Sequence, residues 1–300
     1  MQKWDATFSQ EESKEMLDLI IRSKHEMLRG GGQNIEKQEL KKIKGDVEQA
    51  YEGYYENKEQ LYRIVGIPLS EEQRTALVNA YVANPAVIRA LRKKYISAAR
   101  DCPYCAMGFV KKLDHYLPKQ KFPEFSMLDA NLIPSCSDCN EEKGEKWDCS
   151  KGIIINPFFH EIPTQQILKA RLHKSGHDSI PSVIFYIDDA TDADVGAVAL
   201  FRSHCEKLKL ITSSGCGRYM SKATTQLTTN LHSLKNFYDT LSGKLAPEVA
   251  LKVTFEFLEK EIRSSNEING INHWETALWC AIKDARTELL AFFEEIENQK

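Results

Sequence analysis

The chain has 300 residues, of which 42% are hydrophobic, and a net charge of −3. This length allows one large domain or two to three small ones, and the composition is that of an ordinary soluble globular protein. No run approaches the ~18 apolar residues that a membrane span requires, and the first residues lack the apolar core of a secretory signal. The sequence therefore predicts a cytoplasmic protein that does not enter a membrane.

The first third of the chain, residues 1–100, is expected to be helical. Three glycines at 30–32 are expected to end a first helix, and a second is expected over about 34–64. Ser70 stands three residues before a glutamine, which is typical of a capping box, and predicts a third helix. Asn84 before a proline predicts the N-cap of a fourth.

The middle third holds a short unit that is rich in metal-binding residues, at 101–160. Strands are expected over 109–115 and 131–134, because prolines break the segment between them. A short helix is expected over 137–146. The expected order is therefore strand, loop, strand, helix.

Residues 161–300 are again expected to be mostly helical, with one strand at 183–187. Helical periodicity extends over four segments, 194–208, 218–241, 247–263 and 272–297. The predicted fold class is α+β but mostly α, with helical regions at 1–100 and 161–300 on either side of the 101–160 unit.

Four of the eight cysteines form two C-x-x-C pairs, Cys102 with Cys105 and Cys136 with Cys139. A two-residue spacer lets one turn present two thiolates to the same ion, so the pairs predict a tetrahedral zinc site. Such a site would be structural, because all four ligand positions are filled. The alternatives are four buried reduced cysteines, which need no paired spacing, and a redox C-x-x-C, which is not expected twice.

Residues 89–121 contain nine Lys or Arg residues and only two Asp. A basic patch beside a hydrolytic site suits a polyanionic substrate, although a basic run on its own is more often a solvated helix face. The residues predicted to contact nucleic acid are Arg89, Arg92, Lys93, Lys111, Lys112, Lys119 and Lys121.

Residues suited to acid–base and metal chemistry lie between and after the cysteine pairs. His115 is the candidate general base, because a neutral imidazole accepts a proton from water near neutral pH. Asp114 and Asn140 offer oxygen ligands for Mg²⁺, and Lys143 lies one helical turn after Asn140, where it is expected to hold a phosphate oxygen. Asn131 is expected to hydrogen-bond across the loop and to orient the imidazole.

The segment from Cys102 to Lys146 resembles the HNH endonucleases, also called ββα-metal or His-Me finger nucleases. The family's first histidine falls on His115, its central asparagine on Asn131 and its last metal-binding position on Asn140. The resemblance implies hydrolysis of a phosphodiester with catalytic Mg²⁺ or Mn²⁺ held by Asp114 and Asn140, beside the structural Zn²⁺. The form Asp-His-Tyr-Leu-Pro-Lys and the helical flanks resemble the HNH nucleases of Septu-type anti-phage systems, which implies an ATPase partner.

Three functions remain open from the sequence: a DNA endonuclease in anti-phage defence or restriction, a nuclease that cleaves RNA or tRNA, and a non-catalytic zinc module that binds nucleic acid or a partner protein. The helical flanks far exceed what cleavage requires. They are expected to mediate homodimerisation or to dock a regulator.

Overall fold

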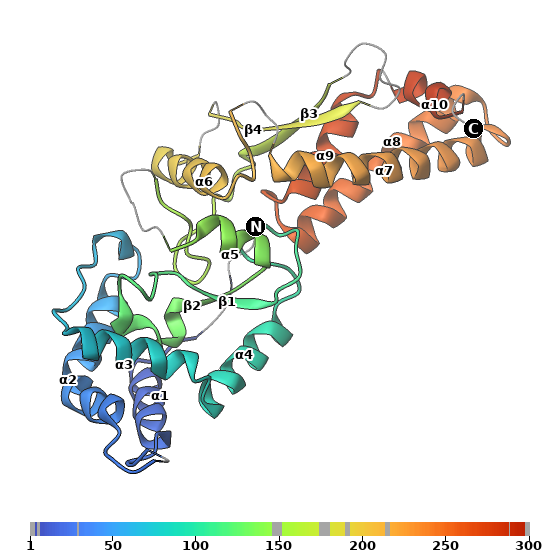
Figure 1. Ribbon diagram of the computed structural model, residues 1–300. Helices are drawn as coiled ribbons and strands as arrows, with labels where there is room; N and C mark the ends of the chain where they lie inside the picture. Colours follow the sequence, from blue (N-terminus) through green and yellow to red (C-terminus); the bar gives the residue numbers. More distant parts are fainter. Residues whose placement is uncertain are drawn as a thin grey trace. The chain divides into compact units, whose positions relative to one another are not determined.

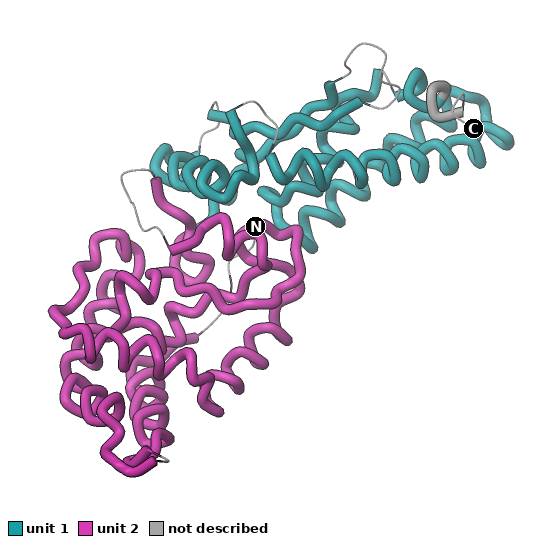
Figure 2. The backbone as a smooth tube through the Cα atoms, in the orientation of Figure 1, with its two compact units in different colours: residues 1–2, 161–300 teal, residues 3–160 magenta. Residues whose placement is uncertain are grey.

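The computed structural model describes residues 4, 7–28, 30–145, 152–173, 181–189, 193–213, 217–287 and 289–297. It divides into two compact units, residues 3–160 and residues 161–300 with the first two residues (Figure 2). The helical region at 1–100 and the cysteine-rich unit at 101–160 therefore belong to the same compact body.

The first unit consists of helices around a small hairpin (Figure 1). Its main elements are α1 (Gln10–Ser23), α2 (Ile35–Glu56), α3 (Glu71–Val82), α4 (Ala86–Ala98), β1 (Lys112–His115), β2 (Leu132–Ser135) and α5 (Ser137–Lys143). Short 3₁₀ helices occur between them in the described residues, namely η1 (Leu61–Arg63), η2 (Pro123–Phe125) and η3 (Asp129–Asn131). The order of strand, loop, strand and helix after residue 101 agrees with the sequence prediction.

Two helix ends differ from the prediction. The second helix, α2, ends at Glu56 rather than near residue 64, and the chain continues into η1. The helix α4 has Pro85 rather than Asn84 as its N-cap, because Asn84 adopts the left-handed conformation with φ +50°. The capping box predicted at Ser70 is present and begins α3.

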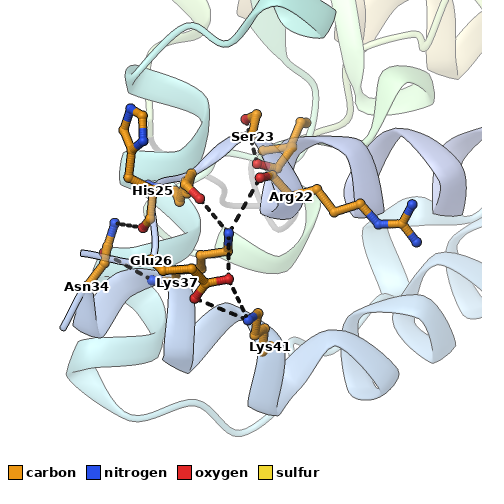
Figure 3. Close-up of polar contacts among 9 residues, drawn as sticks. Arg22, Ser23, His25, Glu26, Asn34, Lys37 and Lys41 are labelled. Carbon is orange, nitrogen blue, oxygen red and sulfur yellow. Dashed lines mark hydrogen bonds and ion pairs between the residues drawn. The ribbon is translucent and has the colours of Figure 1, made fainter. Parts of the chain in front are cut away.

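A buried lysine joins α1 to α2 (Figure 3). The ammonium of Lys37 in α2 donates to the carbonyl oxygens of Arg22, at 3.4 Å, and Lys24, which end α1. It also pairs with Glu26 at 3.0 Å. Because the last carbonyls of a helix have no partner within the helix, this lysine satisfies groups that burial would otherwise penalise.

The hairpin lies against the helices through the segment that joins its strands. Strands β1 and β2 are antiparallel, with Asp114 opposite Ile133 and His115 opposite Leu132. In the joining segment, the ring of Phe125 packs at 5.1 Å from Tyr54 of α2, and the Ser126 hydroxyl donates to a carbonyl of α3, that of Leu77, at 3.0 Å. The helices before residue 100 therefore support the loop that follows His115.

The second unit packs helices against a two-stranded antiparallel sheet. Its elements are β3 (Leu168–His173), β4 (Ser182–Ile187), α6 (Val195–Lys207), α7 (Arg218–Ser242), α8 (Pro247–Asn269), α9 (Trp274–Asp284) and α10 (Leu289–Glu297). Strand β3 was not predicted, because Lys169, Arg171 and His173 make its sequence look like a polar segment. The predicted helix at 272–297 is two helices, and the turn at 285–287 separates α9 from α10.

The coarse fold prediction is confirmed: the part of the chain that the structure describes is mostly helical with two small antiparallel sheets. Among the described residues, no helix is both long enough and apolar enough to cross a membrane.

Candidate functional site

Four buried cysteines meet at the base of the hairpin. The Sγ atoms of Cys102, Cys105, Cys136 and Cys139 all lie within 4.8 Å of one another, and those of Cys105 and Cys136 are 3.8 Å apart. Four thiolates at about 2.3 Å from a central zinc are separated by about 3.8 Å. The cluster therefore has the donor set and the spacing for a structural zinc ion.

Local backbone geometry brings the two pairs together. The first pair lies in a turn closed by the bond from the Cys102 amide to the Gly108 carbonyl, at 2.8 Å. A Cβ atom at Gly108 would lie 2.9 Å from the Cβ of Cys136, so only glycine allows this approach. Cys136 is the N-cap of α5, and its sulfur accepts from the Cys139 amide at 3.4 Å.

The thiols are also chemically suited to a cation. Hydrogen bonds from the neighbouring thiols, Cys102 first, lower the pKa of Cys136 and of Cys105, whereas hydrogen bonds within the same cluster raise the pKa of Cys102 and of Cys139. The thiolate is the form that binds a metal. The cluster therefore favours the metal-binding thiolate at Cys105 and Cys136.

The imidazole of His115 is held in one tautomer. Its Nε2 lies 2.9 Å from the carbonyl oxygen of Ser126, and because a carbonyl only accepts, Nε2 donates and Nδ1 keeps its lone pair. The side chain is 9% exposed, and burial lowers its pKa from 6.5 to about 3. At neutral pH the ring is therefore neutral, the state that a general base requires.

Asn131 fastens the segment that follows His115. Its Oδ1 accepts from the Leu117 amide at 2.8 Å, and its Nδ2 donates to the carbonyls of Leu117 and Phe125, each at 3.1 Å. Since Ser126 follows Phe125 directly, these bonds fix the position of the carbonyl that binds His115. The side chain thus hydrogen-bonds across the loop, and its role in orienting the imidazole stays a prediction.

The carboxylate of Asp114 is buried among donors. The Tyr104 hydroxyl donates to Oδ2 at 2.8 Å, and the Lys143 ammonium lies 3.0 Å from the same oxygen. A carboxylate offers about four acceptor positions, so Asp114 retains capacity for a metal ion.

Lys143 is not placed as the expected phosphate ligand. Its side chain is 3% exposed, and its ammonium also donates to the His115 carbonyl at 2.6 Å. The spacing from Asn140 placed both residues on one helix face, but the side chain turns inward because Asp114 is a buried partner for its charge.

A pocket of about 570 Å³ brings together residues that are distant in the sequence. Asp114 and His115 of β1 line it with Asn140 of α5, and Tyr81 of α3 and Arg92 of α4 complete this part of the wall. Lys111, Lys112 and Lys119 also line it, as do Glu141 and Glu145. We call this space the candidate pocket.

The predicted nucleic-acid contacts divide into two groups. Four of the seven line the candidate pocket: Arg92, Lys111, Lys112 and Lys119. The other three do not: Arg89 donates to the Asn84 carbonyl at 2.6 Å, Lys121 lies over the ring of Phe122 at 5.5 Å, and Lys93 is exposed on α4.

Sequence reasoning missed Tyr81 and Tyr104. The ring of Tyr81 meets that of His115 edge to face, with centroids 4.5 Å apart. Tyr104 stands inside the first C-x-x-C pair, and this position is the only feature of the sequence that could have identified it as a site residue. Tyr81 lies in α3, and no motif or spacing in the sequence links it to His115, so only the fold identifies it. Its contact with His115 arises because α3 packs against the segment that joins the two strands of the hairpin.

The comparisons with known proteins give partial matches. The chain is 48% identical over 191 residues to protein ea31 of Escherichia phage lambda, a match that covers 61% of this chain and 62% of that protein. It is 36% identical over 76 residues to the Septu protein PtuB of Bacillus thuringiensis, covering 22% of this chain and 29% of that protein. The chain thus matches less than two thirds of the length of either relative. No family model matches the chain, and no solved structure matches it.

Proposed function

We propose that the protein is a metal-dependent endonuclease of the HNH type that hydrolyses phosphodiester bonds of DNA. The observation that carries the proposal is the meeting of Asp114, His115 and Asn140 in one pocket whose wall also contains Arg92 and basic lysines. A general base, oxygen ligands for a cation and positive charge for a polyanion are the three requirements of such a reaction.

In this reaction His115 acts as the general base. Its Nε2 donates to Ser126, so Nδ1 is the atom that takes the proton of the attacking water. The neutral state of the buried ring keeps this lone pair available at neutral pH. Asn131 acts through the loop and keeps the Ser126 carbonyl in place.

Asp114 and Asn140 are the residues that would hold Mg²⁺ or Mn²⁺. Carboxylate and amide oxygens are the ligands that these ions accept, and the remaining positions are usually filled by water and phosphate. When bound, the ion would stabilise negative charge on the phosphate and the leaving oxygen. Tyr104 and Lys143 orient the carboxylate of Asp114 for this role.

The biological setting that we propose is anti-phage defence. Its support is the weak similarity to the Septu protein PtuB over 76 residues; the name of the phage relative states no activity. The further proposals are an ATPase or other regulatory partner and a homodimer. RNA, including tRNA, is the alternative substrate, because the groups in the candidate pocket address a phosphodiester and not the sugar.

A substrate panel tests the proposal. The purified protein is incubated with duplex DNA, single-stranded DNA and RNA, each with Mg²⁺, Mn²⁺ or chelator. We expect metal-dependent cleavage of DNA and a loss of about 10²–10⁴-fold for His115→Ala, the range for removing a general base. His25→Ala, a change at an exposed histidine of the same unit, is the matched control.

The panel also separates the alternatives. If only RNA is cleaved, RNA replaces DNA as the substrate class, and the proposed hydrolysis of a phosphodiester is retained. Binding of nucleic acid without cleavage under any metal, with His115→Ala indistinguishable from the wild type, would favour the non-catalytic zinc module.

A further inference from the structure

Arg92 of α4 is held by two uncharged groups. Its Nη1 donates to Oδ1 of Asn84 at 3.2 Å, and its Nη2 donates to the hydroxyl of Tyr81 at 3.4 Å. Among the residues that the structure describes, no carboxylate forms an ion pair with it. The guanidinium is therefore oriented while its charge remains available to an anion.

The backbone at Asn84 makes this arrangement possible. Asn84 has φ +50°, a left-handed conformation that asparagine tolerates better than most residues. It lies between α3 and α4, where its side chain reaches Arg92 and its carbonyl accepts from Arg89 at 2.6 Å. The corner between the two helices thus orients an arginine that lies two turns further along α4.

This corner belongs to the wall of the candidate pocket. Tyr81 and Arg92 line the same pocket as Asp114, His115 and Asn140. The Tyr81 ring lies against His115, with centroids 4.5 Å apart, while its hydroxyl binds the guanidinium. A single tyrosine therefore contacts both the candidate base and the arginine.

We propose that Arg92 binds a non-bridging oxygen of the phosphodiester that is cleaved, and that Tyr81 and Asn84 are its positioning residues. This inference rests on the proposed nuclease function and adds α3 and α4 to the active site. A guanidinium has five N–H donors, and the two bonds to Tyr81 and Asn84 leave others for a phosphate. Because negative charge increases on the phosphate oxygens in the transition state, a donor fixed there accelerates the reaction.

The other cations of the pocket are less suited to this role. The Nζ of Lys112 lies 3.5 Å from Oε1 of Glu141, and the Nζ of Lys119 lies 4.0 Å from Oε1 of Glu145. These acidic neighbours offset part of the charge of the two lysines. Lys111 carries a flexible point charge that does not fix two oxygens in one plane. Arg89 also binds Asn84, through the backbone carbonyl, but it does not line the pocket. We therefore expect a substitution of Arg89 to change KM rather than kcat.

The test compares kcat and KM of five variants on the best substrate of the panel, among them Arg92→Ala, which removes the guanidinium. Arg92→Lys keeps the charge but loses the planar donors, and we expect kcat to fall by about 10²-fold, as when one transition-state donor is removed. Tyr81→Phe keeps the ring and removes the hydroxyl, and Asn84→Ala removes the amide; each is expected to lower kcat by about 10-fold with a smaller change in KM. Lys94→Ala, at an exposed lysine of the same helix, is expected to leave both constants unchanged.

The outcomes distinguish this inference from the proposed function. If the wild type is active and neither Arg92→Lys nor Arg92→Ala lowers kcat, the role of Arg92 is overturned. The nuclease assignment then stays intact. If the wild type cleaves nothing, the nuclease assignment fails, and binding of a short fluorescein-labelled DNA strand decides whether Arg92 contacts phosphate. Arg92→Ala must then weaken binding about 10-fold, and an effect no larger than that of Lys94→Ala would overturn the contact.

Discussion

The hydroxyl of Tyr54 in α2 lies 3.3 Å from Oδ1 of Asn131 and donates to the carbonyl of Ala130 at 3.1 Å. It joins a helix of the N-terminal region to the residue that fastens the loop after His115. From its sequence, this region is expected to serve dimerisation or regulation. These bonds indicate that it also supports the candidate site.

Removal of this hydroxyl should therefore weaken the fold and the activity together. We expect Tyr54→Phe to lower the free energy of unfolding by about 1 kcal/mol, the usual net value of a buried hydrogen bond. If His115 acts as proposed, kcat should fall as well, because the Asn131 side chain loses a partner. Urea unfolding and single-turnover cleavage measure the two effects.

Tyr51 provides a matched control one turn earlier on the same helix. It is as fully buried as Tyr54, but its hydroxyl has no hydrogen-bond partner among the described residues. Tyr51→Phe should therefore leave stability unchanged or raise it. Equal losses in the two variants would mean that ring packing, and not the bond to Asn131, is responsible.

Local sequence patterns predicted the site better than its surroundings. The cysteine pairs and the Asp114-His115 dipeptide lie within one short unit, where spacing alone places the ligands. The inward turn of Lys143 depends on where a buried carboxylate lies, and the contact of Tyr81 with His115 depends on how α3 packs. Such tertiary relationships leave no periodic signal in a single sequence.

The four-cysteine cluster predicts about one zinc ion per chain by elemental analysis. Cys105→Ser should abolish zinc binding and lower the unfolding midpoint of the unit at 3–160, because the affinity of a structural zinc contributes to folding free energy. Cys280→Ser is the control, since Cys280 lies in α9, outside the cluster. Folded wild-type protein with almost no zinc would contradict the assignment.

The buried ammonium of Lys37 should contribute more to stability than its surface neighbour Lys41. Both lie 3.0 Å from Oε1 of Glu26, but the Lys37 side chain is 6% exposed and that of Lys41 is 54% exposed. Lys37→Ala leaves the carbonyls of Arg22 and Lys24 without this donor and should cost about 2 kcal/mol. Lys41→Ala should cost about 0.5 kcal/mol or less, as exposed ion pairs do, and similar losses in urea unfolding would contradict the capping role.

Asp129 predicts a stability change with pH. Its carboxylate accepts from the Ser13 hydroxyl at 2.7 Å and from the Ala130 amide at 2.9 Å, yet burial raises its pKa above the ordinary 3.8. Between the ordinary and the raised pKa the folded state binds more protons than the unfolded state. The contribution of this group to stability is therefore present at low pH and is lost as pH rises through the raised pKa.

Asparagine cannot ionise but keeps the acceptor for Ser13 and Ala130, so it avoids this loss. We expect Asp129→Asn to unfold at higher urea than the wild type at pH 7, and the difference to shrink as pH falls toward 3.8, the ordinary pKa of the group. Asp46→Asn, at an exposed position of α2, controls for the lost surface charge. A difference that stays constant with pH, or a less stable Asp129→Asn at pH 7, would mean that hydrogen bonds to the charged carboxylate outweigh its burial.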